Sequence, residues 1–186
     1  MKIYEDWIRA HLPAEYADQP LDISPGYYLD GLTVMAVGER GGPDTVVCEA
    51  QDEEDLRYWQ LELICRFLPD TQPRVPKTWR YTRHHAENGR WYYTEHRRYD
   101  YNAIEDSRLY GFECLLRNLR PGLPPDRWEQ QVQRHVALMN YWYVKPHWDY
   151  DRERMCFVEI SDSKECDDRG MAVEEPREGS VIEVVK

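Results

Sequence analysis

Residues Met139–Ser161 read MNYWYVKPHWDYDRERMCFVEIS, and they join the end of an amphipathic helix to a pair of short strands. The helix is indicated by apolar side chains that recur at helical spacing and share one face: Trp128, Val132, Val136, Met139 and Tyr143. Pro146 has no N–H and disfavours helix in the residue before it, so the predicted helix ends near Lys145. The run Met155–Ile160 is short, apolar and partly β-branched, which predicts a buried or half-buried strand.

Acidic and aromatic side chains alternate just before that strand. His147, Asp149 and Asp151 are interleaved with Trp148 and Tyr150. If the segment is extended, the first three side chains point to one face and the two rings to the other. Large rings usually serve packing, so the two aromatics are interpreted first as core residues and second as exposed anchors for a partner.

The length and composition indicate one soluble domain over residues 1–186. The chain has fourteen Tyr and seven Trp but only three Phe, so most of its aromatic rings carry a polar group. Such rings suit protein interfaces, which are exposed to water in the free protein and buried in the complex. The chain shows neither a charged-then-apolar leader nor a long apolar run, so we expect no signal peptide and no membrane span. Five scattered Cys without a C-x-x-C pair favour free thiols and a cytoplasmic location.

Charge is distributed unevenly along the chain. Residues 1–57 hold 13 acidic and 4 basic side chains, residues 58–148 hold 10 and 14, and residues 149–186 hold 12 and 6. Two acidic ends therefore flank a mildly basic middle, and the formal net charge is −11. Such a chain repels nucleic acid at long range and attracts basic partners, although net charge also serves solubility alone.

The remaining pattern predicts an α+β fold, in which antiparallel β-hairpins form a sheet packed against three to four helices in a single domain. The helices are expected at residues 1–12, 52–68, 102–119 and 124–145, with Asp52 and Asn102 as caps. The strands are expected at residues 27–29, 32–37, 45–48, 78–85, 90–101, 147–151, 155–160 and 181–185. Asn88-Gly89 predicts a type I′ turn, and residues 162–179 are predicted to form an acidic loop.

Two chemical alternatives arise from these elements. The hairpin 78–101 carries rings together with Arg83, Arg97 and Arg98, a combination that single-strand nucleic-acid binders use. His147, Asp149 and Asp151 share a strand face and could hold a metal ion for a hydrolase. Neither pattern has a supporting motif, and we find no nucleophile elbow or phosphate-binding glycine loop. We therefore assign no catalytic, cofactor-binding or metal-binding residue, and expect neither an enzyme nor bound nucleic acid.

Three runs in the second half of the chain resemble a known family. They are Met139–Trp142, His147–Asp151 and Phe157–Ser161, and the resemblance is most evident over residues 56–162. It is to the cytosolic immunity proteins of bacterial polymorphic-toxin and contact-dependent inhibition systems, closest to the group called immunity protein 63. The resemblance implies a non-enzymatic antidote that binds and blocks a cognate toxin domain, and it carries over no catalytic residue.

An acidic antidote suits a basic toxin enzyme such as a nuclease, because its carboxylates can lie where substrate phosphates would bind. The predicted contact surface is accordingly acidic with a few exposed rings, since buried aromatics dominate interface energies. Its candidates are the first acidic run Asp52, Glu53, Glu54 and Asp55, the tail acids Asp162, Glu165, Asp167 and Asp168, and the rings Tyr27, Tyr28, Trp148 and Tyr150. Helix capping explains the first acidic run equally well.

Overall fold

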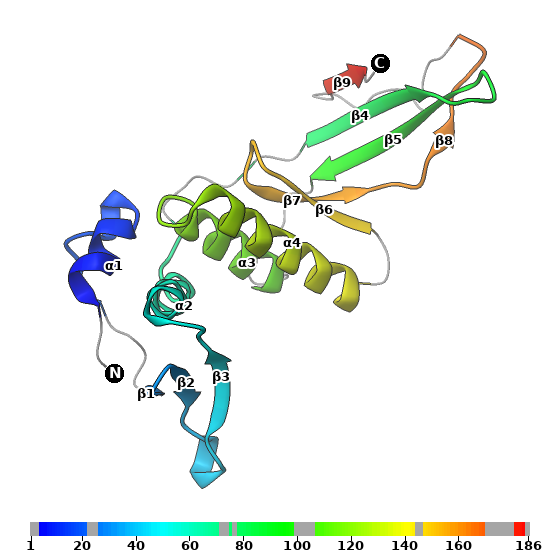
Figure 1. Cartoon of the computed structure of the whole chain (residues 1–186). Coiled ribbons are helices and arrows are strands. Elements are labelled where there is room, and N and C mark those ends of the chain that lie inside the picture. The colour runs from blue at the N-terminus through cyan, green and yellow to red at the C-terminus, as the bar shows by residue number, and fades with distance from the viewer. Residues whose placement is uncertain are drawn as a thin grey trace. The chain divides into compact units, whose positions relative to one another are not determined.

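The computed structural model describes residues 4–21, 26–70, 75, 78–98, 107–143, 147–169 and 181–184, and its elements are labelled in Figure 1. The helices are α1 (Glu5–His11), α2 (Glu53–Cys65), α3 (Ser107–Leu119) and α4 (Pro125–Trp142), with 3-10 turns at Ala14–Tyr16 and Glu39–Gly41. The strands are β1 (Tyr27–Asp30), β2 (Thr33–Ala36), β3 (Thr45–Glu49), β4 (Thr78–His85), β5 (Trp91–Arg98), β6 (His147–Asp151), β7 (Cys156–Ile160), β8 (Lys164–Glu165) and β9 (Val181–Val184).

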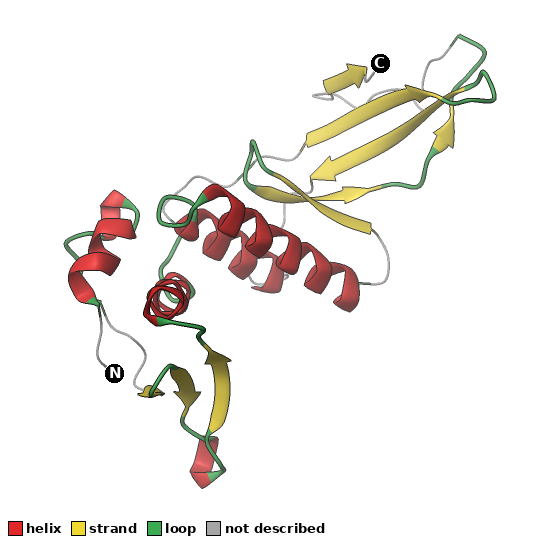
Figure 2. Cartoon of the chain, viewed as in Figure 1, coloured by secondary structure: helices red, strands yellow, loops and turns green. Residues whose placement is uncertain are grey.

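The predicted α+β class is confirmed, with helices and hairpins distributed as Figure 2 shows. The predicted cap at Asn102 lies outside the described residues. Within them, no helix combines the length and the apolar character that a membrane crossing requires.

The chain divides into two compact units. Unit 1 comprises residues 1–72 and 114–131, and unit 2 comprises residues 73–113 and 132–186. The division falls within α3 and within α4, so both helices run continuously from one unit into the other.

Unit 1 contains a three-stranded antiparallel sheet in the order β1-β2-β3, and β3 leads directly into α2. The apolar side chains of this sheet and of α2 form one core cluster: Val34, Cys48, Ala50, Leu56 and Leu63. Asp52 begins α2 as predicted, because its carboxylate accepts the backbone N–H of Asp55 at 2.8 Å.

Unit 2 contains a second sheet in the order β6-β7-β5-β4-β9, with β8 paired to the far end of β5. All its pairs are antiparallel except β4 with β9, which run parallel over residues 80–83 and 181–184. The late strand predicted at 181–185 is therefore confirmed, and it lies at the sheet edge as one end of the strand order. The acidic loop predicted at 162–179 is wrong at Lys164–Glu165, which pair with Tyr92 and Tyr93.

The hairpin that joins β4 to β5 closes differently from the prediction. The backbone N–H of Gly89 donates to the Ala86 carbonyl and the N–H of Ala86 donates to the Arg90 carbonyl, which leaves a three-residue loop. Gly89 has φ +80°, whereas Asn88 is outside the left-handed region. This is a type I turn followed by a left-handed glycine, so the predicted type I′ turn is wrong although the hairpin is confirmed.

The strand β6 ends its sheet with its outward backbone groups already bonded. Asn140 of α4 accepts the N–H of Trp148 at 2.8 Å and donates to the Trp148 carbonyl at 2.8 Å. Two residues further on, the Tyr150 N–H donates to the Asp149 carboxylate at 2.7 Å, and Arg152 donates to the Tyr150 carbonyl at 2.8 Å. Side chains thus occupy the positions that a further strand would need.

A buried ion pair ties α3 to this sheet. Arg98 is 5% exposed, and Glu113 is 2% exposed. Their side chains meet at 2.8 Å, and Glu113 also accepts the backbone N–H of Phe157 at 2.9 Å. Because each charge is enclosed, the pair holds only while both partners remain.

Candidate partner-binding surface

The first acidic run splits into two structural and two exposed carboxylates. Asp52 caps α2, and the Asp55 carboxylate in turn accepts the backbone N–H of Gln51, the residue before the cap, at 3.0 Å. Glu53 and Glu54 are exposed, and neither side chain makes a hydrogen bond or ion pair to the described part of the chain. Capping therefore explains half of the run and leaves the other half available to a partner.

Asp55 also connects α2 to the first turns of α4 within unit 1. Its carboxylate pairs with Arg127, whose guanidinium carbon lies 4.3 Å from the centre of the Tyr58 ring. The Tyr58 ring meets Trp7 edge-on, with 5.2 Å between ring centres. A guanidinium is thus held in unit 1 between a carboxylate and a ring.

Asp55, Tyr58 and Arg127 border a cavity of about 280 Å³. Its lining is polar and aromatic rather than aliphatic, with one leucine: Glu49, Gln51, Asp55, Tyr58, Trp59, Glu62, Leu123, Arg127, Gln130 and Gln131. Glu62 is 4% exposed and pairs with Arg66 at 2.6 Å, whereas Glu49 is exposed at the end of β3. Carboxylate, ring and amide therefore converge on one hollow beside the acidic run.

Sequence reasoning named only Asp55 among these lining residues. The remaining signal was a polar and aromatic stripe at helical spacing, with Tyr58, Trp59 and Glu62 following Asp55 at three, four and seven residues. On α4 the stripe repeats, because Gln130 and Gln131 follow Arg127 at three and four residues. The contact between the two stripes is a tertiary contact, which no local sequence pattern predicts.

Tyr27 and Tyr28 lie on β1, at the opposite edge of the three-stranded sheet from β3. Tyr27 is partly buried against the unit 1 core cluster. The Tyr28 hydroxyl donates to the Asp44 carboxylate at 2.7 Å, and this hydrogen bond raises the pKa of Tyr28. Both rings are half-buried, so part of each ring is held by contacts within unit 1 and part remains accessible to a partner.

Trp148 and Tyr150 are 3% and 2% exposed, which confirms their first interpretation as core residues and corrects their assignment as exposed anchors. The predicted alternation along β6 is confirmed, but the ring face is the buried one. Tyr150 packs edge-on against Phe157 at 5.1 Å between ring centres. The ordinary packing role of large rings therefore explains both residues.

The tail acids belong to unit 2 and are partly engaged there. Glu165 pairs with Arg90 at 2.8 Å, and Asp167 pairs with Arg169 at 3.1 Å. Asp162 and Asp168 are exposed. The tail therefore presents two carboxylates without an ion pair to the described residues, and its other two are partly neutralised.

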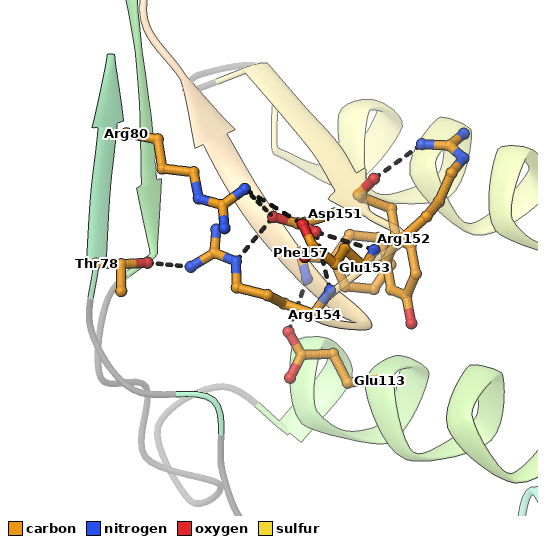
Figure 3. Close-up of polar contacts among 9 residues, drawn as sticks. Thr78, Arg80, Glu113, Asp151, Arg152, Glu153, Arg154 and Phe157 are labelled. Atoms are coloured by element: carbon orange, nitrogen blue, oxygen red, sulfur yellow. Dashed lines mark hydrogen bonds and ion pairs between the residues drawn. The ribbon is translucent and has the colours of Figure 1, made fainter. Parts of the chain in front are cut away.

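Asp151, one of the three candidate metal ligands, is bound by a network of arginine side chains, which Figure 3 shows. The Asp151 carboxylate accepts the backbone N–H of Arg154 at 2.9 Å and its Nε at 2.8 Å, and Arg80 lies 3.6 Å away. Burial alone would raise the pKa of Asp151, but these bonds and charges outweigh it and hold the pKa below its usual value. Arg154 also donates to Thr78, so the network ties the β6–β7 turn to β4.

His147 is exposed at the start of β6, and Asp149 is engaged with the Tyr150 N–H. Across the residues that the structure describes, no group of three or more His, Cys, Asp or Glu side chains is placed to hold a metal ion. Two of the three residues on this strand face are therefore engaged within the chain: Asp149 by a backbone N–H, and Asp151 by a backbone N–H and by arginine.

The nucleic-acid alternative is weakened in the same way. Trp79, Tyr81 and Tyr93 form a buried cluster, so these rings are closed to stacking with bases. Arg98 is held in its buried pair with Glu113, and Arg97 lies 3.7 Å from Glu95. Trp91 is 37% exposed and Tyr92 is half-buried, so these two aromatic rings of the hairpin keep accessible surface.

No protein-family model, curated protein or solved structure matches this chain.

Proposed function

We propose that this protein is an immunity protein, which neutralises a cognate bacterial toxin domain in the cytoplasm by forming a tight protein–protein complex and catalyses no reaction. The observation that carries the proposal is the set of exposed, unpaired acids of unit 1. Glu53 and Glu54 are exposed in the first turn of α2, and the exposed Glu49 borders a cavity lined by rings and carboxylates. The resemblance of residues 56–162 to immunity proteins supports the same function.

Electrostatics favours a basic partner for this face. Unit 1 contains 17 acidic and 8 basic residues, whereas unit 2 contains 18 and 16. Nearly all of the net charge of −11 therefore belongs to unit 1. A basic substrate-binding cleft, such as that of a nuclease, would be steered toward unit 1 and would meet carboxylates in place of phosphates.

The decisive experiment tests the neighbouring genes for one that encodes a toxin domain and coexpresses this chain with that domain. We expect survival of the producing cells, a one-to-one complex on size-exclusion chromatography, and an association rate that falls as ionic strength rises. A cell that dies despite full expression of the folded chain, with no complex formed, would contradict the proposal.

Charge reversal then locates the contact. The double variant Glu53→Lys/Glu54→Lys should slow association by about tenfold or more, because it replaces two steering charges. The matched control reverses two exposed tail acids, Asp162→Lys/Asp168→Lys, and should have a smaller effect. Equal effects of the two variants would assign the contact to the overall charge rather than to unit 1.

A further inference from the structure

The inference below rests on the proposed function and concerns the cavity beside α2. We infer that this cavity receives the guanidinium group of an arginine side chain that the partner presents. The site lies wholly within unit 1, between the residues of α2 and the first turns of α4, with Glu49 of β3 at its rim.

The lining supplies what a guanidinium group requires. A guanidinium has five N–H donors and no acceptor, so its enclosure needs several acceptors in different directions. Carboxylates come from Glu49, Asp55 and Glu62, and the side-chain carbonyls of Gln51, Gln130 and Gln131 add neutral acceptors. The rings of Tyr58 and Trp59 give flat surfaces on which a planar cation stacks.

The charges in the cavity leave one carboxylate without a counter-ion. Asp55 is balanced by Arg127, and Glu62 is balanced by Arg66. Glu49 is exposed and makes no ion pair or side-chain hydrogen bond to the described residues. An entering cation would therefore neutralise Glu49 without breaking either existing pair.

The chain itself shows how the lining accommodates a guanidinium. Arg127 stacks over Tyr58 at 4.3 Å and bonds the Asp55 carboxylate in the same place. An incoming arginine would repeat this arrangement with Glu49 and Trp59. Lysine fits less well, because its ammonium is a strongly hydrated point charge that gains less from a flat ring.

The size of the cavity favours a side chain over a complete small-molecule ligand. Its volume of about 280 Å³ falls just below the range of roughly 300–1,000 Å³ that is usual for ligand pockets. It is still several times the share of about 30 Å³ that one water occupies in the liquid. A single arginine filling a well-lined pocket is a common form of interface hot spot.

The test uses blocked arginine, N-acetyl-arginine amide, added to the isotopically labelled full chain and followed by NMR. We expect saturable shifts of the Trp59 indole N–H and the Gln131 side-chain amide, with half-saturation on the order of 1–10 mM, as befits a fragment. N-acetyl-citrulline amide has the same shape without the charge, and it should bind at least about fivefold more weakly.

Variants locate the binding. Glu49→Gln should weaken blocked arginine by about three- to fivefold, in keeping with the loss of one partly exposed charge. The matched control is Glu39→Gln, an exposed acid of the same unit outside the cavity, which should leave binding unchanged. Both variants should give the dispersed spectrum of the folded chain.

Three results would overturn the inference: no saturable shift with the folded chain, equal binding of citrulline, or an unchanged affinity in Glu49→Gln. None of them requires the toxin, so the cavity and the proposed function can fail separately. If the chain neutralises the toxin but does not bind arginine, the arginine site is disproved and the proposed immunity function stands. If it binds arginine but does not neutralise the toxin, the arginine site stands and the immunity function is disproved.

Discussion

The two units use their charged residues differently. In unit 2 several buried or partly buried acids are paired with arginines, as in Asp151 with Arg154 and Glu113 with Arg98, and these pairs join strands, turns and a helix. In unit 1 the exposed Glu53 and Glu54 make no such pairs to the described residues, and acids outnumber bases by about two to one. Unit 1 has structural ion pairs as well, such as Asp55 with Arg127 and Asp70 with Arg117. The comparison teaches that the acids of unit 2 are nearly balanced by bases, whereas unit 1 carries an excess of acids that remains available for recognition.

The largest effect that would test this contrast is the loss of Glu113. Glu113→Ala leaves Arg98 buried without its counter-charge, so the free energy of unfolding should fall by about 3–5 kcal/mol. Urea denaturation followed by circular dichroism measures the change. The control is Glu87→Gln in the exposed hairpin turn, where a change within about 0.5 kcal/mol is expected. A loss below about 1 kcal/mol for Glu113→Ala would show that the pair is dispensable.

Asp151 should give a smaller effect that depends on pH. Because its pKa is lowered in the folded chain, its stabilisation is present above the unfolded value of about 3.9 and is lost as pH falls through the folded pKa. Asp151→Asn should cost about 1–3 kcal/mol at pH 7 and should cost progressively less below pH 4. Urea midpoints measured from pH 7 to pH 2.5 check this, and a difference independent of pH would contradict it.

Asp52 separates capping from charge in unit 1. Asp52→Ala should lower the free energy of unfolding by about 1 kcal/mol, because the N–H of Asp55 loses its acceptor. Asp52→Asn keeps a capping oxygen and should be nearly neutral. Thermal unfolding of both variants provides the measurement. If the asparagine variant is as unstable as the alanine variant, the carboxylate charge rather than the hydrogen bond holds the helix start.

The smallest effect on stability is expected at the exposed acids of unit 1. Glu53→Gln/Glu54→Gln should change the free energy of unfolding by no more than about 0.5 kcal/mol, since only a weak helix-dipole interaction is lost. The same variant should slow association with a basic partner, measured by stopped-flow fluorescence at low salt. A large destabilisation would make these acids structural and would end the contrast between the units.

Local chemistry predicted much of the fold. The capping aspartate placed α2, Pro146 placed the end of α4 within a few residues, and alternation placed β6. The type of the β4–β5 turn was predicted wrongly. A type I′ turn needs a positive φ at both Asn88 and Gly89, whereas here only Gly89 has one. Periodicity separated Trp148 from Asp149, and the usual packing role of large rings favoured the ring face as the buried one; which element packs against that face depends on tertiary contacts that the strand pattern does not contain.

The candidate site was less accessible from sequence. Asp55 was recognised as part of an acidic run, but its partner Arg127 lies 72 residues further along the chain. The cavity exists only because two polar helix stripes meet, and polar stripes ordinarily indicate a solvated face. Nothing local in Gln130 or Gln131 distinguishes a cavity wall from a wet surface.

The bonded outer margin of β6 has a consequence for the behaviour of the protein in a crowded cell. A sheet margin with vacant amide and carbonyl groups is a template on which a second chain can grow into an aggregate. Here Asn140, Asp149 and Arg152 fill those positions from the same molecule. The edge of this strand therefore offers no vacant backbone groups at Trp148 and Tyr150 as a seed for polymerisation.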